Sequence, residues 1–117
     1  MFLAQILTGL ALFIGEALII GAEMWAAKNF EHSNRPEYLI LTAFVISVIG
    51  AGLLVYGYVW GYQAFKNIWI VTALSVAGIL IVEPLIAWFL FQEIPTKGAL
   101  IGFILGVLGL ISTLTIR

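Results

Sequence analysis

Four long apolar stretches, separated by short polar clusters, dominate this sequence of 117 residues. We place them at about 2–27, 38–62, 68–91 and 98–116. Each is long enough for a helix that crosses a bilayer, which needs about 20 residues. Transmembrane strands alternate apolar and polar residues over about ten positions, and the run from 100 to 110 does not alternate. The sequence therefore predicts an all-α membrane protein in which residues 1–117 form a single four-helix transmembrane domain.

Composition excludes several classes of protein. Hydrophobic residues make up 63% of the chain and charged residues only 9%, whereas about a quarter of a soluble domain is charged. A net charge of -1 with five basic residues lacks the positive surface of a nucleic-acid binder. The sequence contains no cysteine, and His32 is its single histidine. Without metal-ligand spacing, a nucleophile with a base or a phosphate loop, we expect no metal, no cofactor and no enzymatic activity.

Basic residues give only a weak orientation signal. Lys28, Arg35 and Lys97 fall on one predicted side of the membrane, and Lys66 and Arg117 on the other. Orientation follows the Lys/Arg asymmetry of short loops, so a difference of one residue allows two interpretations. The chain inserts in both orientations, or it has a single topology with a weak signal.

Three glutamates lie within the predicted spans. They are Glu16 and Glu23 in the first span and Glu83 in the third. Carboxylates inside a membrane are energetically costly, and they usually face a bundle interior or a water-filled cavity on a transport path. We therefore treat these three residues as candidate proton- or substrate-binding groups.

Glu16 is the deepest of these acids. At about 100° per residue, Glu16 and Glu23 project from one face of a helix, separated by about 10 Å of rise. Removal from water disfavours a charged carboxylate, so Glu16 is expected to hold either a proton or a cation. The alternative is a permanently protonated, hydrogen-bonded carboxyl. Glu23 is a candidate gate, or it extends to the membrane interface beside Lys28.

Pro84 directly follows Glu83. A proline inside a helix removes one backbone hydrogen bond and bends the helix, so Pro84 is a candidate hinge. Glu83 is then either a second polar contact for a substrate or a structural partner of the bend.

Small residues suggest where helices meet. Four glycines on the last predicted span form a candidate dimer interface: Gly98, Gly102, Gly106 and Gly109. Such spacing lets backbones approach closely in lipid. Because four helices enclose little interior, a homodimer is the simplest way to build a polar pathway. Gly57 and Gly61 in the second span serve the same purpose or pack within one chain.

Aromatic side chains gather near the end of the second span. Tyr56, Tyr58 and Trp60 are a candidate aromatic wall, because their rings attract organic cations. An interfacial aromatic belt is the alternative interpretation.

The segment from 84 to 96, with the sequence PLIAWFLFQEIPT, is followed by Gly102 and Gly109. It resembles the end of the four-helix repeat of the drug/metabolite transporter superfamily, whose best-known short members form the small multidrug resistance family. The resemblance implies an antiparallel homodimer in a prokaryotic plasma membrane that exchanges protons for cationic substrates. It also implies that Glu16, which matches in kind, is the shared binding glutamate.

These observations predict a secondary active transporter whose partners are membrane lipid, a second copy of the chain and a small-molecule substrate. Two alternatives stay open. One is a non-transporting accessory subunit of a larger membrane complex, and the other is a subunit of a lipid-linked sugar flippase.

Overall fold

The computed structural model describes residues 2–116. All regular secondary structure in this part of the chain is α-helix. The helices are α1 (Phe2–Asn29), α2 (Pro36–Phe65), α3 (Ile68–Phe91) and α4 (Lys97–Thr115). Each is long and apolar enough to cross a membrane. The predicted all-α, four-helix membrane class is therefore confirmed. Arg117, used above to judge orientation, lies outside the described residues.

The residues at the starts of α2, α3 and α4 explain why these helices begin where they do. α2 starts with Pro36 in its first turn, where a missing backbone N–H costs nothing. The Asn67 side chain caps α3 by accepting a hydrogen bond from the Trp69 backbone N–H at 3.0 Å, and Thr96 caps α4 through Ala99 at 3.2 Å. These caps satisfy N–H groups that have no partner inside the helix.

Two helices end at a non-glycine residue with a left-handed backbone conformation. Lys66 after α2 and Gln92 after α3 adopt left-handed backbone conformations, with φ of 55° and 57°. In each case the backbone N–H donates to a carbonyl of the preceding turn, at Tyr62 and Trp88. This geometry closes the helix and turns the chain, although glycine is the residue that usually adopts it.

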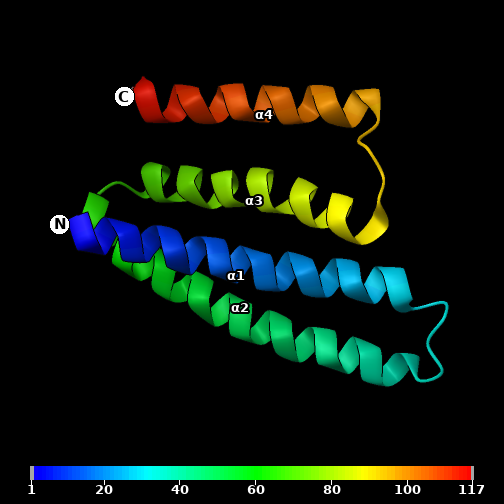
Figure 1. Ribbon diagram of the computed structural model, residues 1–117. Coiled ribbons are helices and arrows are strands. Elements are labelled where there is room, and N and C mark those ends of the chain that lie inside the picture. The colour runs from blue at the N-terminus through cyan, green and yellow to red at the C-terminus, as the bar shows by residue number, and fades with distance from the viewer. Residues whose placement is uncertain (1, 117) are drawn as a thin grey trace.

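Successive helices run in opposite directions, and the two closest neighbours are α1 and α2 (Figure 1). Their backbones meet at Gly15 and Gly50, where neither residue has a side chain to hold the helices apart. α3 packs mainly against α1. Leu12 and Val71, both fully buried, belong to the interior of this three-helix unit.

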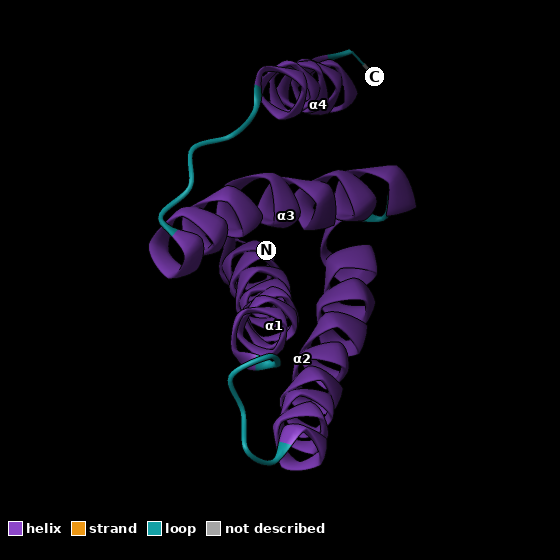
Figure 2. Ribbon diagram, turned by 90° about the vertical axis from the view of Figure 1, so that its right-hand side faces the viewer, coloured by secondary structure: helices purple, strands orange, loops and turns teal. Residues whose placement is uncertain are grey.

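α4 stands apart from the other three helices. Among the described residues it packs only against α3, which separates it from α1 and α2 (Figure 2). None of its residues is buried. In lipid an apolar helix surface needs no cover, so α4 can remain peripheral.

Candidate functional site

Glu16 lies in the interface between α1 and α3. Only 7% of its surface is exposed, and its Oε1 accepts a hydrogen bond of 3.0 Å from the Ser75 hydroxyl. Ser75 is buried to the same degree. The structure thus joins the deepest acid of α1 to a hydroxyl of α3, 59 residues away in the sequence.

Small residues on both sides make room for this contact. Gly15, the preceding residue, meets α2, so Glu16 is turned toward α3. There, a Cβ built on Gly78 would lie 3.5 Å from the Cγ of Glu16. Gly78 therefore leaves the carboxyl stem in contact with the α3 backbone, about one turn from Ser75.

The charged residues that affect Glu16 electrostatically are also acids. Within the described residues, these groups are Glu23 and Glu83. Glu23 is exposed, while Glu83 is half-buried. Of the three candidate acids, only Glu16 is buried by the surrounding helices.

Glu83 and Pro84 belong to a different place. Both line a cavity between α3 and α4, together with residues of the following link. Glu16 does not line that cavity. The structure therefore separates the buried acid of α1 from the acid at the proline of α3.

The candidate aromatic wall is split between exposed and half-buried positions. Tyr56 is 59% exposed and Trp60 38% exposed, and their rings pack with centroids 5.6 Å apart. Tyr58 is half-buried. Trp60 lines a small cavity with Ala4 and Leu7 of α1, and neither Glu16 nor Ser75 lines that cavity.

The four glycines of α4 also divide. A Cβ built on Gly98, Gly102 or Gly109 would have no neighbour within 4 Å, whereas one on Gly106 would lie 3.1 Å from the Leu80 side chain of α3. Gly106 thus packs against α3 within the chain, Gly109 lines a cavity between α3 and α4, and Gly98 and Gly102 lie on an open face. Gly57 and Gly61 of α2 both pack against α1.

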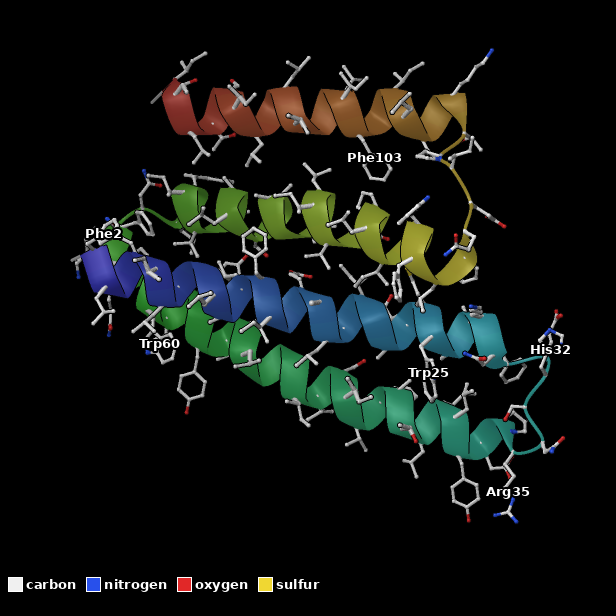
Figure 3. All side chains as sticks on the ribbon, viewed as in Figure 1. Phe2, Trp25, His32, Arg35, Trp60 and Phe103 are labelled. Carbon is white, nitrogen blue, oxygen red and sulfur yellow. The ribbon has the colours of Figure 1, made fainter. Side chains whose placement is uncertain are left out.

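Two features of the site could not be read from residue types. Ser75 is one of two hydroxyl residues of α3, and its pairing with Glu16 depends on how α3 is rotated. Phe103 projects from α4 toward α3 (Figure 3) and lines the cavity that contains Glu83. One sequence signal did exist, because Glu16 and Ser75 are among the few polar residues of two predominantly apolar helices.

Comparison with protein-family models, with curated proteins and with solved structures finds no match for this chain.

Proposed function

We propose that this protein is a secondary active membrane transporter, a short member of the drug/metabolite transporter superfamily that exchanges protons for a small organic cation or metabolite. The observation that carries this proposal is the burial of Glu16 between α1 and α3. The segment from 84 to 96 supports the superfamily, and four apolar helices support a site within the bilayer.

The surroundings of Glu16 favour reversible occupation over a fixed ion pair. A buried carboxylate is costly unless a proton or a cation neutralises it. Ser75 supplies one hydrogen bond, and the charged residues acting on Glu16 are acids. A hydroxyl lowers the cost of the charged form without removing the charge. One group that holds either a proton or a cation, and not both, couples their opposite movements.

A homodimer completes the proposal. One chain encloses little space, and Glu16 is the one buried acid among its described residues, so a second copy is proposed to complete the polar pathway. The open glycine face of α4, formed by Gly98 and Gly102, supports self-association because small residues allow close helix contact in lipid. A prokaryotic plasma membrane is the location that the superfamily resemblance supports.

The test is uptake into proteoliposomes under an imposed pH gradient, using a panel of labelled organic cations and metabolites. Wild-type protein is expected to accumulate at least one compound against its gradient. Glu16→Gln, which keeps an oxygen acceptor for Ser75, is expected to fold and dimerise but to lose coupled uptake. Glu37→Gln is the matched control, since Glu37 is exposed in the first turn of α2. Coupled uptake by Glu16→Gln at the wild-type rate would contradict the proposal.

A further inference from the structure

α3 and α4 leave a slot between them on the opposite side of the Leu80–Gly106 contact from Glu83. Two adjoining cavities of about 400 and 570 Å³ form it, and they share Trp69 and Thr113 as lining residues. We name the two cavities together the α3–α4 slot. It is distinct from the cavity that contains Glu83, because the two have no lining residue in common.

The slot runs from one membrane face to about the middle of the bilayer. α3 begins and α4 ends on the same side of the bundle (Figure 1), and Asn67 and Ile116 at these two ends line the slot. Its inner end is at Gly106, the tenth of the 19 residues of α4, where the Leu80 side chain lies against α4. From Gly106 to Ile116 a helix rises about 15 Å, which is half of a hydrocarbon core about 30 Å thick. The depth of the slot is therefore that of one lipid leaflet.

Polarity changes along the slot. The outer cavity contains the Asn67 amide and the Ser112 hydroxyl. The inner cavity has two hydroxyls, on Thr72 and Thr113, and is otherwise lined by apolar or small residues, which are Trp69, Ala73, Val76, Gly106, Gly109 and Leu110. A polar mouth beside an apolar interior matches an amphiphile whose head lies at the membrane face and whose chain lies in the hydrocarbon.

The electrostatics of the mouth favour a phosphate on its α3 side. The start of α3 carries the partial positive charge of free backbone N–H groups, and the end of α4 carries a partial negative charge. Among the described residues, none that lines the slot has a charged side chain. The Asn67 oxygen caps α3 by accepting from Trp69, which leaves the Asn67 amide nitrogen as a donor. Lys66, the exposed residue before it, adds a positive charge near this side, and a zwitterionic headgroup can direct its ammonium toward α4.

A flexible chain fits the slot better than a helix of a second copy does. A helix with its side chains is about 10–12 Å across, whereas α3 and α4 already touch at Leu80 and Gly106. An empty apolar slot would lose dispersion contacts along both of its walls. Acyl chains surround these helices in a bilayer and can enter the slot from the side.

We propose that the α3–α4 slot binds one phosphatidylethanolamine molecule, with an acyl chain between the two helices and the phosphate at Asn67 and the first turn of α3. The bound chain fills the space beside the Leu80–Gly106 contact and so holds α4, none of whose residues is buried, against α3. This inference goes beyond the proposed transport and depends only on the four-helix membrane class.

The experiment uses lipid brominated near the glycerol end of its acyl chains, because bromine quenches the fluorescence of a tryptophan that it contacts. Trp69 lines both cavities of the slot. It is the only tryptophan of a parent chain that carries Trp25→Phe, Trp60→Phe and Trp88→Phe. Full-length parent protein in maltoside micelles is titrated with brominated phosphatidylethanolamine. We expect saturable quenching with one bound lipid per chain, relieved by unbrominated phosphatidylethanolamine.

Two variants of the parent chain address the two parts of the slot. Gly109→Leu puts a side chain into the inner cavity, where a Cβ has nothing within 4 Å, and should weaken binding about tenfold by displacing part of the acyl chain. Asn67→Asp keeps an oxygen that caps α3 but replaces the amide donor with a carboxylate. The repulsion of the phosphate should weaken binding about fivefold. Gly52→Leu and Asn34→Asp make the same changes at open or exposed positions outside the slot and are the matched controls.

Three outcomes contradict the inference. Quenching that rises without saturation would show that lipid only partitions into the micelle. Equal affinities of Gly109→Leu and Gly52→Leu, or of Asn67→Asp and Asn34→Asp, would place the bound lipid elsewhere. A lower dimer fraction of Gly109→Leu with unchanged lipid affinity would assign the slot to a second copy. Equal unfolding temperatures without lipid show that affinity, and not folding, is compared, and relief of quenching in the parent chain needs no slot variant.

Discussion

Gly15 of α1 and Gly50 of α2 approach each other so closely that neither position has space for a side chain. A Cβ on Gly15 would lie 2.9 Å from the Gly50 carbonyl oxygen, and a Cβ on Gly50 would lie 2.8 Å from the Gly15 carbonyl oxygen. Both obstacles are backbone atoms, which cannot rotate away. This crossing fixes α1 against α2 and directs the next residue, Glu16, toward α3.

Alanine at either glycine should therefore separate the two helices. We expect Gly15→Ala and Gly50→Ala each to lower the free energy of unfolding by about 1–3 kcal/mol, the usual cost of overpacking. Gly52→Ala is the matched control, because a Cβ there has nothing within 4 Å. Thermal unfolding in detergent micelles compares the three variants. Equal midpoints for Gly50→Ala and Gly52→Ala would show that the close approach does not hold the helices together.

Ser75→Ala should leave Glu16 without its hydrogen-bond donor. A buried polar group that loses its partner costs about 1–3 kcal/mol, and we expect a loss of stability in that range. Ser112→Ala makes the same chemical change at an exposed position of α4 and should have little effect. In a double-mutant cycle, Ser75→Ala should cost less when Glu16 is already alanine. Additive effects of the two substitutions would remove the link between these residues.

Lys66→Gly should stabilise the protein. Lys66 holds a left-handed φ of 55°, which glycine adopts without the steric cost imposed by a Cβ. We expect a gain of about 1 kcal/mol in the free energy of unfolding, similar to other relieved left-handed positions. Gln63→Gly, inside α2, should instead lose about 1 kcal/mol through helix propensity. Unfolding in micelles tests the opposite signs, and a loss at Lys66 would contradict the capping role.

Gly102→Leu should impair dimerisation. Gly102 has no neighbour within 4 Å, so a leucine there can be accommodated within one chain but would hold apart two α4 helices that meet at this face. We expect the dimer fraction in micelles to fall at least several-fold, measured by analytical ultracentrifugation. Gly52→Leu places the same side chain on an equally open face of α2 and is the control. An unchanged dimer fraction for Gly102→Leu would exclude this face as the interface.

The sequence predicts the helices well because apolar length alone determines whether a segment can span a bilayer. The predicted third stretch, 68–91, agrees with α3, whereas α2 extends beyond the predicted 38–62 at both ends. The predicted stretch leaves out Pro36, although proline is well suited to a first helical turn. At the other end, the helix continues to Phe65, until Lys66 adopts its left-handed conformation.

The candidate site is harder to predict from the sequence, because it depends on how the helices are rotated against one another. The spacing of Glu16 and Glu23 gives them a common helix face, but it does not reveal that Ser75 covers only one of them. The grouping of Glu83 with Glu93 depends on a non-glycine residue, Gln92, in a left-handed conformation. No residue pattern in the sequence predicts this left-handed conformation at Gln92.

The central claim is that one buried carboxyl exchanges a proton for a cationic ligand, and proton release measures this exchange directly. Protein in weakly buffered micelles is mixed with a saturating permanent cation identified by the uptake screen, and the released protons are counted with a pH indicator. Wild-type protein should release protons on binding over the pH range in which Glu16 is protonated. Glu16→Gln should release none, and Glu37→Gln should behave as wild type. Equal proton release from wild type and Glu16→Gln would contradict the account.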